Sequence, residues 1–340
     1  MKILYIDSPI DPPGGGQKSL LILLKNVKAE KKIFLPQYSS FCEILKKEKI
    51  DYEIVPIARL FKEIKKYNPD IIHCNAATVK YSFFSALFSK IFKIPFIWHV
   101  RVAEKAFLKD DLIAFLSYKT IAVSYTVKNK FSNIWHKKIS VIFNSVSDDF
   151  LPSKTDMRKE LKISGNEKLI GIFSRFDYWK GHDLFVESAF MLIAKGYKLK
   201  FILCGNGHKQ EEIRRKVYSS PFSSFFIFKE YEENIADYMN ACDIVVSAST
   251  IEEAFGRTLI EAMSLRKVVV ATNLGGHREI IENEINGFLC EPNTLSLTES
   301  LLKALNSKTP IKENAFNTFN SKFSLDVHIS QINNIYSQLL

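Results

Sequence analysis

The sequence lacks the features of a secreted or membrane-spanning protein. It has no run of 18 apolar residues, and the four apolar residues after Lys2 are too few for the hydrophobic part of a signal peptide. Cysteine is scarce, and the five cysteines are odd in number and lack the paired spacing of a metal site: Cys42, Cys74, Cys204, Cys242 and Cys290. We therefore expect a cytoplasmic protein whose cysteines are reduced thiols in the core.

Several ligand-binding signatures are also missing. Neither G-x-G-x-x-G nor G-x-x-x-x-G-K-[ST] occurs, which argues against NAD-binding and P-loop proteins. The second half of the chain has no acidic D-x-D sequence to hold a divalent cation, so we expect no metal site. No recognised DNA- or RNA-binding motif is present either.

Excess positive charge is confined to the first part of the chain. Residues 1–150 carry 24 Lys and Arg against 14 Asp and Glu, a net of +10, whereas residues 151–340 carry 23 of each. The asymmetry predicts contact with a polyanion, either a membrane surface or a nucleic acid. The alternative is that the lysines serve only solubility.

Length and composition predict two globular domains of the α/β class. The 340 residues exceed one hydrophobic core, and 46% hydrophobic residues argue against a disordered protein. Short apolar strands alternate with helical patterns in both halves, as in parallel sheets with right-handed crossovers. We predict two doubly wound, Rossmann-like domains facing across a cleft, over residues 1–150 and 151–325. A last helix follows over residues 326–340, and the sequence leaves open whether it returns to the first domain.

Thirteen strands are predicted from short apolar segments bounded by polar residues. Seven lie in the first half, over residues 2–6, 32–34, 52–55, 71–74, 96–100, 120–123 and 139–142. Six lie in the second half, over residues 169–173, 200–204, 225–228, 243–248, 267–272 and 287–290. The clearest helical pattern is 78–92, and we predict that its apolar stripe is a core face rather than a lipid-binding one: Phe84, Leu87, Phe88, Ile91 and Phe92.

Residues that directly follow predicted strands are candidates for a binding site, because ligands of open α/β sheets bind beyond the carboxyl ends of the strands. Gly14-Gly15-Gly16 lies between the first strand and a helix, where backbone N–H groups bind anions well. Gly205-Asn206-Gly207 follows a later strand and either allows close approach of a ligand or makes a turn. Glu230 and Tyr231 follow the next strand, and His99 lies near the end of another.

Two pairs of charged residues stand out in the second half. Arg175 and Lys180 lie five positions apart around a tight loop and suit a diphosphate, since Arg binds bidentately and Lys is a compact charge. Glu253 and Glu261 form an E-x7-E pattern with Phe255-Gly256 between them. Eight helical residues span about 12 Å, which approaches the length of a nucleotide sugar. The alternatives are an exposed charged turn and two solvated glutamates.

Together these segments resemble the retaining family-4 glycosyltransferases, which have the two-domain GT-B fold. The resemblance covers nearly the whole chain and is strongest from about residue 169 to residue 292. It is carried by S-R-F at 174–176, Lys180-Gly181, G-N-G at 205–207, E-A-F-G at 253–256 with Glu261, and Gly275-Gly276. Weaker matches in the first half are the glycine-rich loop, His99 and Asn144.

The resemblance implies a donor site with divided roles. Arg175 and Lys180 would hold the donor diphosphate, while Glu253 and Glu261 would bind the transferred sugar and the ribose. The backbone N–H groups of residues 255–257 would face the sugar or distal phosphate, and His99 would lie near the sugar from the opposite domain. The predicted site comprises the catalytic residues His99, Arg175, Lys180 and Glu253 and the donor-binding residues Gly15, Gly16, Arg175, Lys180, Gly205, Asn206, Glu230, Tyr231, Glu253, Ala254, Phe255, Gly256, Arg257 and Glu261.

The chemistry expected of such a site needs neither a cofactor nor a metal ion. Departure of a nucleoside diphosphate builds negative charge, which Arg175, Lys180 and the start of the helix after Gly256 would stabilise. Front-face attack, in which the departing phosphate oxygen takes the acceptor proton, would retain configuration without an enzyme nucleophile. Positioning and charge stabilisation would then carry most of the rate.

The sequence therefore predicts a retaining, metal-independent hexosyltransferase that moves a sugar from a UDP- or GDP-sugar to a lipid-linked or glycan acceptor. Surface polysaccharide, lipopolysaccharide or glycan assembly would fit. The basic first half predicts peripheral contact with the anionic inner face of the cell membrane. No nucleic acid partner is expected, because the charge-balanced half carries the best motifs. The alternatives are a nucleotide-sugar epimerase or phosphorylase of related fold, or a basic nucleic-acid-binding protein.

Overall fold

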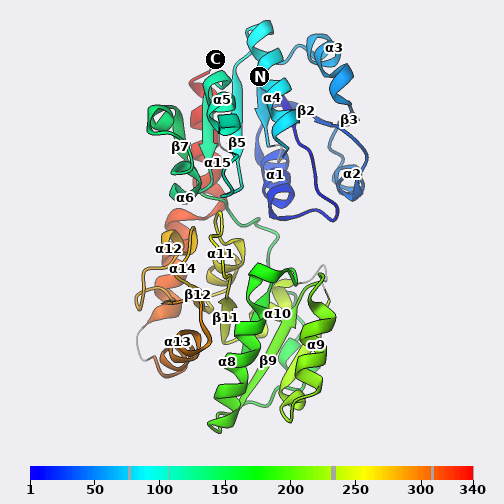
Figure 1. Cartoon of the computed structure of the whole chain (residues 1–340). Coiled ribbons are helices and arrows are strands. Elements are labelled where there is room, and N and C mark those ends of the chain that lie inside the picture. The colour runs from blue at the N-terminus through cyan, green and yellow to red at the C-terminus, as the bar shows by residue number, and fades with distance from the viewer. Residues whose placement is uncertain (76–77, 107, 231–234, 308–309, 340) are drawn as a thin grey trace. The chain divides into compact units, whose positions relative to one another are not determined.

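The computed structural model describes residues 1–339 with the exception of 76–77, 107, 231–234 and 308–309. The chain divides into two compact units, coloured from blue to red along the sequence in Figure 1. Unit 1 is Met1–Ser145 together with Leu325–Leu340, and unit 2 is Val146–Ser324. The predicted boundary after residue 150 therefore differs by a few residues from the one in the structure, and the last segment belongs to unit 1.

Unit 1 is built on a seven-stranded sheet in the order β3-β2-β1-β4-β5-β6-β7, in which every pairing is parallel. Its strands are β1 (Lys2–Ile6), β2 (Glu30–Leu35), β3 (Tyr52–Ile54), β4 (Ile71–Cys74), β5 (Phe96–Val100), β6 (Lys119–Ala122) and β7 (Ile139–Val141). Its helices are α1 (Gly15–Asn26), α2 (Ser40–Lys47), α3 (Ile57–Tyr67), α4 (Val79–Phe92), α5 (Leu108–Leu116), α6 (Tyr125–Lys128), the 3-10 helix η1 (Asn133–Lys138) and α15 (Leu325–Ser337).

Unit 2 is built on a six-stranded parallel sheet in the order β10-β9-β8-β11-β12-β13. Its strands are β8 (Lys168–Phe173), β9 (Leu199–Cys204), β10 (Phe226–Lys229), β11 (Ile244–Ser247), β12 (Val268–Thr272) and β13 (Phe288–Cys290). Its helices are α7 (Met157–Glu160), η2 (Tyr178–Lys180), α8 (His182–Ala194), α9 (Gln210–Tyr218), η3 (Ser223–Phe225), α10 (Ile235–Ala241), α11 (Arg257–Ser264), α12 (His277–Ile280), α13 (Thr294–Asn306) and α14 (Ile311–Lys322).

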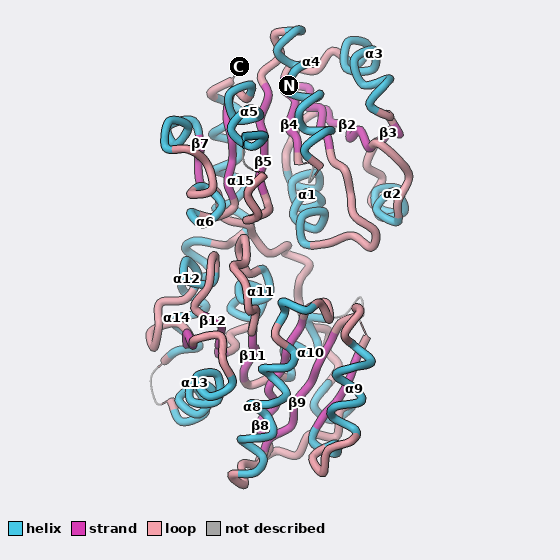
Figure 2. The backbone as a smooth tube through the Cα atoms, viewed as in Figure 1, coloured by secondary structure: helices cyan, strands magenta, loops and turns pink. Residues whose placement is uncertain are grey.

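The two sheets confirm the predicted doubly wound α/β class. Figure 2 shows the strands of each unit in magenta among helices in cyan. Residues Val268–Thr272 of β12 and Phe96–Val100 of β5 are buried along their whole length, as expected of strands covered on both faces. Such strands read as continuous apolar runs, which made them visible in the sequence.

The C-terminal helix α15 completes the core of unit 1. Ile332, Ile335 and Tyr336 are buried in one apolar cluster with residues of β1, including Ile3 and Tyr5. Figure 1 shows this helix in red beside the strands of the same unit. Unit 1 therefore forms from the two ends of the chain.

The prediction for the helix at residues 78–92 was wrong about its core face. The buried side of α4 is formed by Tyr81, Ser82, Ser85, Ala86 and Ser89. The predicted stripe is half-buried, and Ile91 is 55% exposed. Small residues let the helix lie close to the sheet, and each buried serine hydroxyl donates to a backbone carbonyl within α4 or at its first turn.

Each sheet has one point where the strand order reverses. In unit 1 this point lies between β1 and β4, and in unit 2 it lies between β8 and β11. Loops that leave neighbouring strands in opposite directions open a crevice there, and open α/β sheets bind ligands in it. The loops after β1, β4, β8 and β11 are therefore where a site is expected.

Two further features of the described residues bear on the sequence predictions. Within the described part of the chain, no helix combines the length and apolarity required to cross a bilayer. All five cysteines are buried and unoxidised. The thiols therefore serve as core residues, as predicted.

Candidate active site

The site in unit 2 centres on an ion pair at the reversal point of the sheet. Lys180 lies in η2, which follows β8, and Glu253 lies in the loop that follows β11. Nζ of Lys180 is 2.5 Å from Oε1 of Glu253, and the two side chains are 23% and 19% exposed. The structure thus brings together two of the four residues that were predicted to be catalytic.

Burial and the charge of Lys180 shift the pKa of Glu253 in opposite directions. Burial raises the pKa of this carboxyl, but the charge and hydrogen bond of Lys180, with a hydrogen bond from the Ser249 hydroxyl, hold the pKa below its ordinary value. Glu253 is therefore an ionised hydrogen-bond acceptor at neutral pH. A general acid would need the opposite shift.

The loop that carries Glu253 is held by the glycine pair after β12. The N–H of Gly276 donates to the carbonyl of Glu253 at 2.8 Å. A Cβ on Gly276 would lie 2.5 Å from Cα of Phe255, so only glycine allows this approach. His277 then anchors α12, because its Nε2 lies 3.1 Å from Oγ of Ser247 on β11 and its Nδ1 lies 3.0 Å from the carbonyl of Thr272.

Arg175 forms an ion pair of its own, with Asp177. Its Nη2 lies 2.6 Å from a carboxylate oxygen of Asp177, and its side chain is 51% exposed. The loop after β9 packs closely against the backbone next to Arg175. A Cβ on Gly205, which has φ +147°, would lie 2.0 Å from the carbonyl oxygen of Ser174. Gly205 therefore serves the close packing of one loop on another, a role that the sequence did not indicate. The carbonyl of Asn206 accepts from the N–H of Phe176 at 3.0 Å.

The helix α11 begins beside these loops. Gly256 precedes it with φ +124°, and Oγ1 of Thr258 donates to the carbonyl of Phe173 at the end of β8. The first-turn N–H groups of a helix carry partial positive charge, so this end of α11 suits an anion. One turn along, Arg257 and Glu261 form an ion pair of 3.1 Å.

The remaining predicted donor residues of unit 2 divide into described and undescribed positions. Glu230 follows β10 and is exposed, and its backbone carbonyl accepts from the thiol of Cys204 at 3.3 Å. Ala254 lies in the loop between Glu253 and Phe255, and Phe255 is buried. Tyr231 lies outside the described residues.

Unit 1 has a polar network at its own reversal point. Gly15 and Gly16 open α1, and the side chain of Gln17 accepts from the N–H of Gly14 at 3.1 Å. Gln17 in turn donates to Asp7 at 3.0 Å, and Asn75 donates to the other oxygen of Asp7 at 3.2 Å. Burial raises the pKa of Asp7 to about 6.

Arg101 joins this network to two further predicted residues. Its guanidinium donates to the side-chain carbonyls of Asn75 and Asn144 and to Nδ1 of His99, the last at 3.3 Å. His99 is 1% exposed, and burial together with the charge of Arg101 lowers its pKa well below the ordinary value. His99 is therefore a neutral imidazole.

The network borders a pocket of about 390 Å³ within unit 1. The first turn of α1, Asn75 and Arg101 line one part of it, and Trp98 contributes an apolar wall. Lys130 and Asp110 line another part as an almost fully buried ion pair of 3.2 Å. The pocket combines apolar walls with a few hydrogen-bond donors and acceptors, as sites for small ligands commonly do.

Sequence reasoning missed several members of the unit 1 site. Asp7, Asn75 and Arg101 carry no motif, although each follows a strand and that position was a usable signal. Among the described residues, no group of three or more His, Cys, Asp or Glu side chains is placed to hold a metal ion.

The chain is similar in sequence to known glycosyltransferases. Residues 153–321 match the family described as Glycosyl transferases group 1. An uncharacterized glycosyltransferase of Methanocaldococcus jannaschii is 27% identical over 283 residues, which cover 79% of this chain and 76% of that protein. The human alpha-1,3/1,6-mannosyltransferase ALG2 is 23% identical over 270 residues, which cover 73% of this chain and 61% of that protein.

Solved structures support the fold. The crystal structure of the Anabaena protein HepE in complex with UDP superposes with a TM-score of 0.88 at 24% identity, covering 99% of this chain and 100% of that one. Its complex with UDP-glucose gives a TM-score of 0.86 at 23% identity with the same coverage. At this identity the likeness establishes architecture alone. Residues 153–321, just under half of the chain, belong to the group 1 glycosyltransferases, and the chain as a whole has the GT-B fold.

Proposed function

We propose that the protein is a retaining, metal-independent hexosyltransferase that uses a UDP- or GDP-sugar. The observation that carries the proposal is the Lys180–Glu253 pair at the reversal point of the unit 2 sheet, beside the start of α11. A cation, an ionised acceptor and a helix N-terminus meet there. The cation and the helix N-terminus suit the negative diphosphate, and the ionised acceptor suits the hydroxyl groups of the sugar.

The role of each group follows from its chemistry. Lys180 and Arg175 bind the diphosphate and stabilise the charge that develops on the leaving oxygen. The N–H groups at the start of α11 face the same anion. Glu253 exchanges its contact with Lys180 for hydroxyl groups of the transferred sugar, and Glu261 binds the ribose hydroxyls. Glu253 positions the sugar and transfers no proton, because its pKa is low.

Retention follows from attack on the face that the diphosphate leaves. The acceptor hydroxyl forms the new bond to the anomeric carbon while the bond to the phosphate oxygen breaks, and that oxygen takes the hydroxyl proton. Atoms and charge balance without an enzyme nucleophile or base. The UDP and UDP-glucose complexes of HepE favour uracil as the first donor base to test.

Three variants of unit 2 test this donor site. Lys180→Ala, Arg175→Ala and Glu253→Gln should each reduce transfer at least about a hundredfold, because each removes a charged contact to the leaving group or the sugar. Lys216→Ala is the matched control, since it also removes an ion-paired lysine of unit 2, one that contacts Asp183 and Glu187. Activity near the wild-type level in all three variants would refute the site.

The stereochemistry and the metal requirement are measured with the same enzyme. We expect the product to keep the anomeric configuration of the donor by NMR, and transfer to continue in excess EDTA. An inverted product, or activity lost to EDTA and restored by a divalent cation, would overturn these parts of the proposal.

We propose that the acceptor is lipid-linked or a glycan and binds in the unit 1 pocket beside Gln17 and Arg101. A few polar side chains and the first turn of α1 line this otherwise apolar pocket, which lies at the reversal point of its sheet. Human ALG2 is named as a mannosyltransferase, which is compatible with a sugar acceptor. Arg101→Ala should raise the KM for the acceptor while UDP affinity stays unchanged.

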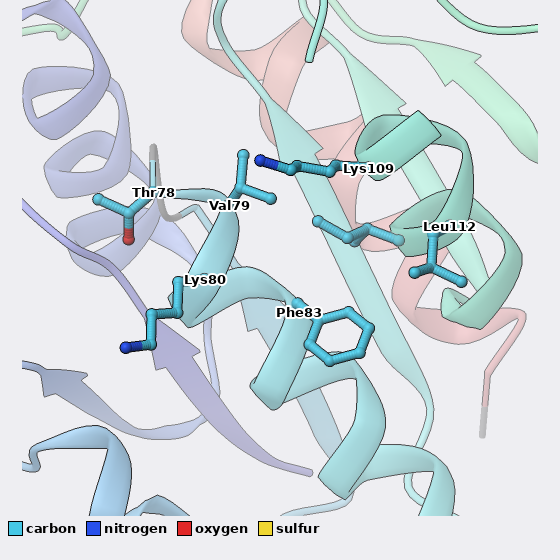
Figure 3. A pocket seen from close by; sticks show the side chains of 7 residues that line it. Thr78, Val79, Lys80, Phe83, Lys109 and Leu112 are labelled. Atoms are coloured by element: carbon cyan, nitrogen blue, oxygen red, sulfur yellow. The ribbon is translucent and has the colours of Figure 1, made fainter. Parts of the chain in front are cut away.

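A second surface of unit 1 supports contact with an anionic lipid bilayer. Leu108, Leu112 and Phe115 on α5 are 73%, 46% and 54% exposed. Between α4 and α5 lies an apolar pocket of about 490 Å³, in which Phe83 is turned toward Leu112 (Figure 3). Lys80 and Lys109 line the same pocket, and residues 1–150 hold the whole net charge of +10. Exposed apolar side chains rimmed by lysines suit an anionic membrane surface.

Co-sedimentation with vesicles of phosphatidylglycerol and phosphatidylcholine tests this contact. Lys80→Ala/Lys109→Ala should bind about thirtyfold more weakly at low salt, since each lysine contributes about 1 kcal/mol near such a surface. Lys195→Ala/Lys198→Ala removes two exposed lysines of unit 2 and is the control. Equal binding by both variants, or no binding by the wild type, would refute the surface.

A further inference from the structure

Four buried side chains of unit 1 form a continuous hydrogen-bond chain from the C-terminal helix to His99. The hydroxyls of Tyr5 and Tyr336 are 3.1 Å apart, and the Tyr336 hydroxyl is 2.7 Å from Nδ1 of His73. Nε2 of His73 is 3.1 Å from Nδ1 of His99. All four residues are at most 1% exposed, so water cannot substitute for any of these contacts.

The direction of the chain is set at its His99 end by Arg101. Nη2 of Arg101 lies 3.3 Å from Nδ1 of His99. A guanidinium is always protonated and can only donate, so Nδ1 of His99 must be the acceptor. A neutral imidazole has one N–H, and His99 therefore carries its proton on Nε2.

The acceptor role of the His99 Nδ1 then fixes the donor and the acceptor of every other hydrogen bond in the chain of four side chains. With a lone pair on Nδ1 of His99, His73 must donate through Nε2, because two facing lone pairs would repel. Nδ1 of His73 is then an acceptor, and the Tyr336 hydroxyl donates to it. The Tyr336 oxygen accepts in turn from the Tyr5 hydroxyl. Only one arrangement of protons satisfies all the contacts.

One polar atom at the end of the chain has no partner. Across the described residues, no group forms a hydrogen bond with Nε2 of His99, although the atom is buried. A buried N–H without an acceptor costs about 1–3 kcal/mol, so a ligand oxygen that accepts from it would bind favourably. The atom is thus prepared to bind something that the protein alone does not supply.

We propose that Tyr5, Tyr336 and His73 are positioning residues that lock His99 as a hydrogen-bond donor, with its proton on Nε2, for an acceptor oxygen of the substrate. His99 then orients the substrate and does not act as a general base. The neighbouring charged and titratable groups are Arg101, His73 and His328, and each opposes a second proton on His99. The identity of the bound oxygen rests on the proposed function, whereas the proton arrangement does not.

The proton arrangement is measured on the protein alone by 15N NMR of its seven histidines. His73→Gln and His99→Gln identify the two signals. We expect His99 to be neutral from pH 5 to pH 8 with hydrogen on Nε2, and His73 likewise. A proton on Nδ1 of His99, or an imidazolium in this range, overturns the inference even if the enzyme is a glycosyltransferase.

The role of Tyr336 is tested against a matched tyrosine. Tyr336→Phe removes the donor to His73, so both tautomers of His73 should appear and kcat should fall roughly two- to tenfold. Tyr81→Phe also deletes a buried hydroxyl of unit 1, which donates to the carbonyl of Val55 at 2.8 Å. Tyr81 is not a member of the hydrogen-bond chain that ends at His99. This substitution should leave the His73 signal and kcat unchanged. A single unchanged His73 tautomer in Tyr336→Phe would refute the role of Tyr336.

Substitutions of the histidines separate positioning from structure. Gln keeps an N–H donor close to the place of the His73 Nε2, so His73→Gln should retain most activity and His73→Phe should lose it. His99→Gln should likewise transfer sugar faster than His99→Glu, because glutamate places a proton acceptor where His99 has its N–H. If His99→Glu is the more active of the two, His99 is a base and the proposal fails. If the NMR result holds and the wild-type protein transfers no sugar, the proposed function fails instead.

Discussion

Nζ of Lys180 and Oε1 of Glu253 are 2.5 Å apart, although 73 residues separate them in the sequence. Neighbouring strands β8 and β11 bring them together, because these strands end at the same edge of the unit 2 sheet. The pair links the fold to the proposed chemistry, since each member would contact a different part of the same donor.

The first prediction concerns the stability of this pair. Lys180→Ala leaves the partly buried Glu253 without its cation, and we expect a loss of about 2 kcal/mol of unfolding free energy at neutral pH. Lys180→Ala/Glu253→Ala should lose less than the sum of the single variants. Urea unfolding of the four proteins gives the coupling energy, and additive losses would show that the pair contributes nothing.

The effect of Lys180→Ala should also depend on pH. The folded-state pKa of Glu253 is held low, so ionised Glu253 favours the folded protein above its unfolded pKa. That contribution disappears as the pH falls through the folded pKa. The difference in unfolding free energy between wild type and Lys180→Ala should therefore shrink on acidification from pH 7 toward pH 3.

The contribution of Asp7 to stability should also depend on pH, but it should decrease as the pH rises, whereas that of Glu253 increases. The pKa of Asp7 is raised from 3.8 to about 6, so the folded state holds the proton more tightly than the unfolded state. This contribution to stability is complete below pH 3.8 and is lost as the pH rises through about 6, a change of about 3 kcal/mol. Asp7→Asn should lack this slope, whereas Asp148→Asn, a change at an exposed site, should keep it.

Glycine substitutions test the packing of the unit 2 loops. Gly205→Ala forces a Cβ into the carbonyl of Ser174 at a positive φ, so we expect a loss of at least about 2 kcal/mol of unfolding free energy. Gly165→Ala is the control, because nothing lies within 4 Å of its Cβ position. Equal thermal midpoints for the two variants would contradict the close approach of the loops.

The C-terminal helix is predicted to be essential for unit 1. Ile332 is fully buried in the unit 1 core, so Ile332→Ala should cost about 2–5 kcal/mol. Asn333→Ala changes the exposed neighbour on the same helix and should be nearly neutral. A small loss in Ile332→Ala, measured by denaturant unfolding, would mean that unit 1 folds without α15.

The central strands were predictable because both sheets are parallel and their central strands are covered on both faces. A strand such as β12, Val268–Thr272, is buried at every position and stands out as an apolar run. The face of α4 was not predictable by the same logic. The sheet requires small side chains where a helix lies close to it, so Ser82, Ser85 and Ser89 are buried while Ile91 is exposed. Hydrophobicity alone ranks these residues in the reverse order.

The sequence by itself determined the class of fold and several members of the unit 2 site, because parallel strands and the loops after them are local patterns. It could not determine which side chains pair. Tyr336 and His73 lie 263 positions apart and meet only because α15 packs into unit 1. The position of the proton on His99 depends on a further contact, in which the guanidinium of Arg101 can only donate. Such contacts depend on burial and long-range packing, which no local pattern of residues encodes.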